Sequence, residues 1–145
     1  RELYETGWMH NRVRMITASF LVKHLRINWQ EGEKHFRDCL FDFNEANNVA
    51  GWQWVAGCGA DAAPYFRIFN PILQGEKFDP NGEYVKKWIP ELIKVPKEFI
   101  HKPWELDRNV KDFKLGKSYP NPIVDHVAAR NAALEAFKKI KKNPI

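Results

Sequence analysis

Cysteines and clusters of metal ligands are scarce in this sequence. The two cysteines, Cys39 and Cys58, form no CxxC pair and no group with spaced histidines. Neither a zinc site nor a disulfide framework is therefore predicted. Because reduced thiols are the usual state of cysteine in the cytosol, we expect a cytoplasmic protein without a bound metal.

Long hydrophobic runs are also missing. No apolar segment approaches the roughly 18 residues needed to cross a bilayer, and the first residues lack the apolar core of a signal peptide. No membrane partner is therefore expected. The chain begins at Arg1, without a methionine, and enters a helical pattern at once, which predicts that it is cut from a longer protein.

Strand patterns of useful length and internal repeats are absent from the sequence, whereas apolar residues recur at helical spacing. The pattern predicts an all-α fold with long ordered loops, and glycine and proline are densest at 57–82. The expected helices are one ending before Gly7, then 11–25, 30–40, 45–56, 83–88 and a last one that Asp125 caps, with Val127, Ala128, Leu134, Phe137 and Ile140 facing inward.

The bulk composition is that of a soluble globular protein. A chain of 145 residues with 44% hydrophobic and 28% charged residues is long enough to bury a core. The net charge of +5 permits an anionic partner such as nucleic acid. Much of that excess lies in the lysines near the C-terminus, which a solvated terminal helix explains more simply than a binding patch does.

The stretch 42–71 is the most informative part of the chain. It reads DFNEANNVAGWQWVAGCGADAAPYFRIFNP and combines an acid, a run of asparagines, two tryptophans and three glycines. Indole rings and carboxamides beside glycines indicate a site for a flat aromatic ligand that forms hydrogen bonds. A plain core helix with buried tryptophans, followed by a glycine-rich turn, is the alternative.

A second candidate feature lies upstream. Arg12 and Arg14 stand beside Trp8, His10 and Asn11. The planar guanidinium suits a phosphate or a carboxylate. Solvated arginines at the start of a surface helix are the alternative.

Two blocks resemble a known family. The residues GWMHNRVRM at 7–15 and the block 48–71 strongly resemble the C-terminal half of the flavin-binding helical domain of DNA photolyases and cryptochromes. The similarity continues through 77–80, 82–84 and 88–92, so it covers nearly the whole chain. The tripeptide WQW at 52–54 looks most like class I cyclobutane pyrimidine dimer photolyases.

The resemblance implies a set of cofactor-binding residues. Asn48 matches the amide beside flavin N5, and such an amide can hydrogen-bond the flavin in more than one redox state. Asp42 matches an acid that contacts the flavin and pairs with Arg14. Asn44 departs from the family, where a second Asp is common. Its amide can bond a sugar hydroxyl, or the residue can serve as a helix cap. Asn11 matches a position near both cofactor and lesion.

The resemblance also implies residues for electron transfer and for DNA. Trp52 and Trp29 match the proximal and middle members of the tryptophan chain that photoreduces the flavin. Trp54 matches the residue that stacks on the flipped dimer. The remaining DNA- or lesion-contacting candidates are Asn11, Arg12 and Met15, with Arg67 and Lys77 for backbone phosphates.

The activity implied is light-driven repair of cyclobutane pyrimidine dimers in DNA by electron transfer from reduced FAD, a carbon–carbon lyase reaction. Residues 1–145 are expected to be part of the FAD-binding helical domain, without the N-terminal antenna domain and the first half of the helical domain. Any antenna chromophore would bind outside them. Alone, they are expected to be inactive and to bind FAD poorly or not at all, whereas the full-length protein is expected to be a monomer.

Two other functions stay open. A cryptochrome-type photoreceptor would bind FAD without repairing DNA, although Asn48 and Trp54 favour repair. A basic helical module that binds nucleic acid without a cofactor would leave every tryptophan structural. Flavin absorption would exclude the module without a cofactor. Dimer repair under blue light would separate a photolyase from a cryptochrome.

Overall fold

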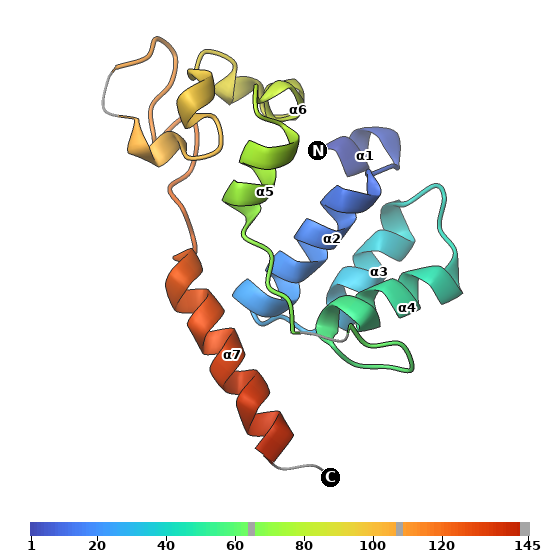
Figure 1. Cartoon of the computed structure of the whole chain (residues 1–145). Helices are drawn as coiled ribbons and strands as arrows, with labels where there is room; N and C mark the ends of the chain where they lie inside the picture. The colour runs from blue at the N-terminus through green and yellow to red at the C-terminus, as the bar shows by residue number, and fades with distance from the viewer. Residues whose placement is uncertain (64–65, 107–108, 143–145) are drawn as a thin grey trace. The chain divides into compact units, whose positions relative to one another are not determined.

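Helices dominate the part of the chain that the structure describes, residues 1–63, 66–106 and 109–142 of a computed structural model (Figure 1). Over these residues the structure contains no strand, and the pairing is limited to isolated bridges. The all-α prediction is confirmed. The elements are α1 (Glu2–Thr6), α2 (Asn11–Ser19), η1 (Phe20–His24), α3 (Trp29–Cys39), α4 (Glu45–Ala56), α5 (Pro71–Phe78), α6 (Glu83–Trp88), η2 (Pro90–Leu92), η3 (Lys97–Phe99), η4 (Pro103–Glu105) and α7 (His126–Lys142).

The chain divides into two compact units. The first comprises Arg1–Phe69 and Val124–Ile145, and the second comprises Asn70–Ile123. In the first unit, α3 packs on α4 and α2 also contacts α4. The core of this unit is built from Leu3, Ala18, Phe36, Leu40, Trp52 and Val55.

Polar caps set the limits of α3 and α4. The Asn28 side chain accepts a hydrogen bond from the Gln30 backbone N–H at 3.1 Å, and α3 begins at the next residue. Gly57 ends α4 with φ 78°, a left-handed conformation that glycine adopts without a Cβ clash. The predicted helix 45–56 is confirmed, and Gly51 lies within it.

The predicted helix 11–25 is interrupted. After Ser19 the hydrogen bonding widens into the π-helix η1, in which the Leu25 N–H donates to the Phe20 carbonyl at 3.1 Å. A π turn inserts an extra residue and so shifts the side chains that follow it. The shift places Lys23 and His24 in the interior, at 3% and 7% exposure.

The second unit is held by its own small core of Leu92, Val95 and Ile100. Asp79 fixes the start of α6 because its carboxylate accepts from the N–H groups of Tyr84 and Val85 at 3.2 and 3.1 Å. The helix α5 lies within 57–82, which the sequence pattern predicts as loop. Asn70 accepts from the N–H of Ile72 at 3.0 Å and Pro71 occupies the first turn, a regular helix start.

The last helix begins as predicted. The Asp125 carboxylate accepts from the Ala128 N–H at 2.7 Å. The predicted inward face is wrong at three positions, because Val127 and Ile140 are 64% and 69% exposed and Ala128 is exposed. The helix turns Ala133 inward instead, at 3% exposure. A small residue at that point allows close packing.

Candidate functional site

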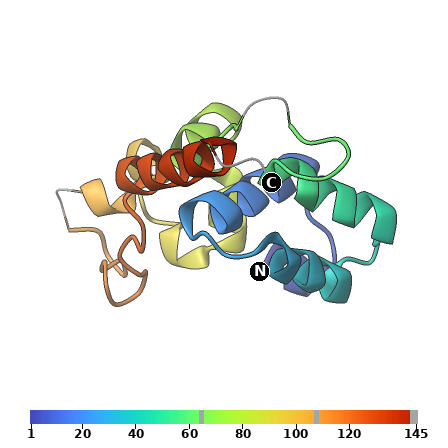
Figure 2. The same cartoon turned by 90° about the horizontal axis from the view of Figure 1, so that it is seen from below.

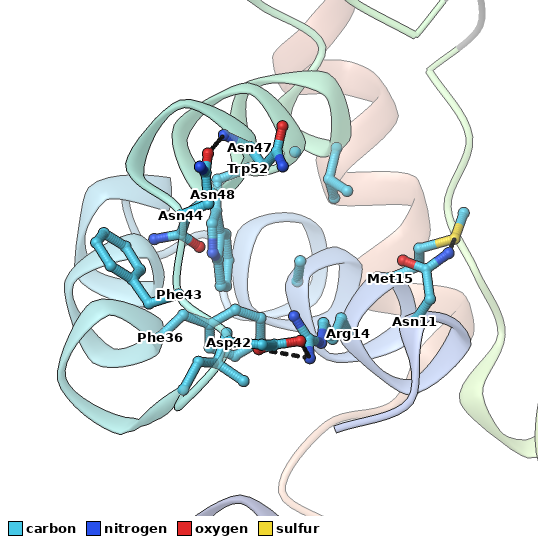
Figure 3. A pocket seen from close by; sticks show the side chains of 14 residues that line it. Asn11, Arg14, Met15, Phe36, Asp42, Phe43, Asn44, Asn47, Asn48 and Trp52 are labelled. Carbon is cyan, nitrogen blue, oxygen red and sulfur yellow. Dashed lines mark hydrogen bonds and ion pairs between the residues drawn. The ribbon is translucent and has the colours of Figure 1, made fainter. Parts of the chain in front are cut away.

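A cavity of about 290 Å³ opens in the first unit (Figure 3). Its walls combine amides, one acid and one arginine with aromatic and aliphatic side chains. The lining residues are Asn11, Arg14, Met15, Ala18, Phe36, Leu40, Asp42, Phe43, Asn44, Asn47, Asn48, Gly51, Trp52 and Val55.

Two helices supply most of this wall with regular spacing. On α4 and its cap the lining positions are 44, 47, 48, 51, 52 and 55, and on α2 they are 11, 14, 15 and 18. Steps of three and four residues keep side chains on one face of a helix. This part of the wall is therefore a continuous stripe on each helix, and it holds six residues predicted from the resemblance: Asn11, Arg14, Met15, Asn44, Asn48 and Trp52. A seventh, Asp42, lines the cavity from the turn before α4.

Arg14 and Asp42 form an ion pair at one side of the cavity (Figure 3). Arg14 Nη2 lies 3.0 and 2.8 Å from the two carboxylate oxygens, and Arg14 Nε donates to the Met9 carbonyl at 2.6 Å. The side chains are 24% and 38% exposed. Water screens a pair this exposed, so its main effect is to orient both groups and not to stabilise the fold. The predicted pairing is confirmed.

Asn48 is held by a buried acid from the neighbouring helix. Its Nδ2 donates at 3.0 Å to both the backbone carbonyl and Oε1 of Glu33. Arg37 donates to the same Oε1 at 2.9 Å. Glu33 is 6% exposed and thus depends on these donors for its charge. The contacts occupy the amide NH₂ and leave its oxygen as the group that a ligand can use.

Trp52 forms the floor of the cavity. Its ring meets Phe36 edge to face, with centroids 5.0 Å apart at 71°. The indole fits because α3 has glycine at position 32, where a Cβ would lie within 2.6 Å of three indole carbons. Trp52 is 3% exposed, and its Nε1 has no hydrogen-bond partner among the described residues. A buried N–H without an acceptor is costly.

Asn44 is both a cavity residue and the cap of α4. Its Oδ1 accepts from the Asn47 N–H at 3.0 Å, which confirms the cap alternative for this residue. We expect Asn44→Ala to lower the free energy of unfolding by about 1 kcal/mol, because a first-turn N–H loses its acceptor. Asn44→Asp retains the acceptor and should leave that free energy unchanged or slightly higher. Urea unfolding followed by circular dichroism measures both, and equal losses in the two variants would contradict the capping role.

Four predicted residues of the first unit lie outside the cavity wall. Trp29 and Trp54 are half-buried and pack against the core. Arg12 is half-buried on α2, where its N–H donates to His10 Nδ1 at 3.1 Å. Arg67 is exposed, with its guanidinium carbon 4.6 Å from the Phe69 ring centroid.

One predicted residue belongs to the second unit. Lys77 is exposed in α5, with its ammonium 5.3 Å from the ring centroid of Phe78. The described residues of the chain hold no group of three or more potential metal ligands. Over the same residues, no helix is long and apolar enough for a membrane span.

The sequence reasoning missed several residues of the site. Glu33 and Gly32 act on the cavity from the buried face of α3, and their contacts are with α4, which no local pattern reveals. Asn47 and Gly51 could have been found, because they share the helical spacing of Asn48 and Trp52.

Comparisons with known proteins agree on one family. A sequence family described as "FAD binding domain of DNA photolyase" matches residues 1–139. The deoxyribodipyrimidine photo-lyase of Agrobacterium fabrum is 59% identical over 145 residues, which cover 98% of this chain and 30% of that protein. Its counterpart in Escherichia coli is 53% identical over 142 residues, covering 98% of this chain and 29% of that protein.

Solved structures agree with the sequence matches. A bacterial class III photolyase from Agrobacterium tumefaciens superimposes with a TM-score of 0.92 at 59% identity, over 99% of this chain and 30% of that one. A cryptochrome from Synechocystis gives a TM-score of 0.85 at 39% identity, over 93% and 28% of the two chains. The present chain thus spans about three tenths of the length of these relatives.

Proposed function

Because this chain belongs to the FAD-binding domain family of DNA photolyases, we propose that it serves in light-driven repair of pyrimidine dimers in DNA. Membership in this family confirms the resemblance seen in the sequence. It also confirms FAD as the cofactor of the domain. The class I assignment stays a prediction, and one of the structural relatives is described as class III. We also propose that residues 1–145 are part of a larger helical domain.

The observation that carries the proposal is the chemistry of the cavity wall. The wall offers the amide oxygen of Asn48, the indole of Trp52 and the pair of Arg14 with Asp42. A flavin ring is flat and aromatic, with hydrogen-bonding atoms along its edge, so these residues fit it. When bound, FAD supplies the light-excited electron donor that repair requires.

The protein's own part is to bind and orient. The α4 stripe presents Asn48 and Trp52 on one face, and Glu33 fixes the rotation of the Asn48 amide. Asp42, held by Arg14, is placed to accept from a ligand N–H. Apolar groups of the same wall, Phe36 and Leu40 among them, limit water in the cavity and so strengthen these polar contacts.

Further roles are proposed on the resemblance alone. Trp29 and Trp52 relay an electron to the cofactor, and Trp54 stacks on an extruded base. For the DNA, Arg12 and Met15 contact the lesion, with Arg67 and Lys77 at backbone phosphates. Asn11 serves both the cofactor and the lesion.

The cavity volume supports a second proposal, that these residues alone bind FAD weakly. About 290 Å³ lies near the lower limit of small-molecule sites, roughly 300–1,000 Å³. Such a cavity holds a ring system and not a whole dinucleotide. Isothermal titration of the 145-residue chain with FAD should show no saturation at micromolar concentration, and submicromolar affinity would contradict this proposal.

The function is tested on the complete gene product that carries this segment. We expect a yellow preparation with flavin absorption and blue-light-dependent loss of dimers from an irradiated oligonucleotide. Flavin without repair would favour the cryptochrome alternative, which the similarity to the Synechocystis cryptochrome supports. No flavin at all would favour a nucleic-acid-binding module. Trp54→Ala should weaken binding of dimer-containing DNA by about 1–3 kcal/mol and leave flavin content unchanged.

A further inference from the structure

The helix α7 packs against η1 in the first unit (Figure 2). Two histidines from these distant parts of the chain are in contact. His24 Nε2 lies 2.8 Å from His126 Nδ1, and the ring centroids are 5.0 Å apart. His24 is 7% exposed within η1, and His126 is the first residue of α7. The contact therefore ties the first turn of the last helix to the interior of the unit.

A hydrogen bond between two imidazole nitrogens needs one N–H and one lone pair. A neutral pair supplies both, and so does a pair that shares one extra proton. When both rings are protonated, two N–H groups and two positive charges face each other, and the bond is lost. The contact is thus stable in two protonation states and unstable in the third.

The surroundings offer His24 little compensation for a charge. Burial, and then the charge of His126, lower the pKa of His24 below its usual value, and the Ser19 carbonyl opposes them only in part. No hydrogen bond of acceptable geometry reaches His24 Nδ1 from the described residues. Asp125, the nearest acid along the chain from His126, is already engaged as the cap of α7.

Other charged groups around η1 do not supply a counter-charge. The main elements packed against η1 are α2, α3, α4 and α7. Across the described parts of these elements, His126 alone has a charge that acts on the pKa of His24. Lys23, the neighbour of His24, donates to the Arg67 carbonyl and lies 4.6 Å from the Phe66 ring centroid. Burial lowers its pKa to about 8, so it titrates above the histidine range.

We propose that His24 and His126 form a pH-sensitive clasp that holds the first turns of α7 on η1 and opens when both rings carry a proton. The opening is local, because Phe66 and Phe137 stack 4.2 Å apart farther along α7 and contain no titratable group. The stabilising contribution of neutral His24 is complete above the unfolded pKa of about 6.5. It declines as the pH falls from there through the lowered pKa of the folded state.

Hydrogen–deuterium exchange of the complete gene product that carries this segment, at about pH 7.5 and about pH 5.5 and corrected for the intrinsic pH dependence of exchange, tests the clasp. Protection of the first-turn amides of α7 should fall by roughly three- to tenfold at the lower pH. The amides of α4 should keep their protection. Equal protection of α7 at both pH values, or an equal loss in α4 and α7, would overturn the proposal.

The matched variant is His126→Asp. Its carboxylate accepts from His24 Nε2–H whether or not that ring is charged, and Asp suits the first turn of a helix. Protection of α7 at the lower pH should therefore equal or exceed that at the higher pH, the reverse of the parent chain. A variant with the same loss as the parent would show that other groups cause the pH dependence.

Discussion

Replacing Gly32 with alanine is expected to lower the free energy of unfolding by about 2–3 kcal/mol and to displace the indole of Trp52. The added Cβ would lie within 2.6 Å of three carbons of that ring. The ring cannot retreat easily, because it is 3% exposed and packed against Phe36. Since α3 and α4 must separate or the indole must turn into the cavity, flavin binding by the complete gene product should also be lost.

Gly51→Ala is the matched control for this substitution. Gly51 also lies inside a helix, but a Cβ built there meets nothing within 4 Å. Alanine has a higher helix propensity, so the free energy of unfolding should rise by about 0.5–1 kcal/mol. Because Gly51 lines the cavity, the added methyl group should weaken flavin binding in a protein that is more stable.

Urea unfolding and flavin titration of the two variants separate packing from occupancy. The expected result is a loss of stability only for Gly32→Ala and a loss of affinity for both. Equal stability changes in the two variants would show that the close contact of Gly32 with Trp52 does not govern the packing of α3 on α4.

The contrast between these glycines also shows what a sequence can predict here. Both glycines stand in helices, and a sequence pattern assigns each the same penalty. Only the packing of α3 on α4 distinguishes them: Gly32 leaves room for the indole of Trp52, whereas Gly51 lines the cavity. The same holds for Glu33, because only the packing of α3 on α4 shows that this acid is buried against Asn48.

Local chemistry was sufficient where caps and stop signals are strong. The limits of α4 follow from Asn44 and Gly57, and the start of α7 follows from Asp125. The same signals at Asn70 and Pro71 predict α5, but the surrounding glycines and prolines obscured them. The π turn of η1 has no comparable signal, so the burial of His24 could not be predicted from spacing.

The site itself was predictable to the extent that it lies on helical stripes. Six residues drawn from the resemblance line one cavity because α2, α4 and the α4 cap present them at three- and four-residue spacing, and Asp42 joins them from the turn before α4. The other residues drawn from the resemblance, Trp29 and Trp54 among them, do not line the cavity. The proposed role of Trp54 involves DNA and that of Trp29 involves electron transfer. The first can be tested only with DNA and the second only with light.

Asn48→Asp is the substitution for which the structure gives the sharpest pH dependence. The Asn48 NH₂ lies 3.0 Å from the Glu33 carboxylate, and aspartate would replace this donor with a second carboxylate. Two acids this close share one proton, so the folded state retains a proton that the unfolded state releases at about pH 4. A folded pKa raised in this way means that stability declines as the pH rises from about 4 through the raised value. The variant should be nearly as stable as the parent at about pH 5 and about 2–3 kcal/mol less stable at about pH 7.5.

Glu33→Gln in the same chain supplies the control, because the glutamine amide can donate to the new carboxylate at position 48, as Asn48 donates to Glu33 in the parent. The double variant should regain most of the lost stability at the higher pH and lose the pH dependence. Urea unfolding of the parent, both single variants and the double variant at the two pH values gives the coupling free energy directly. A pH-independent loss in Asn48→Asp, or no recovery in the double variant, would show that Glu33 does not orient the amide. With Glu33 as its partner, the amide at position 48 presents its oxygen to a ligand. A carboxylate there would present a shared proton instead, so this one contact determines whether position 48 offers a ligand an acceptor or a proton.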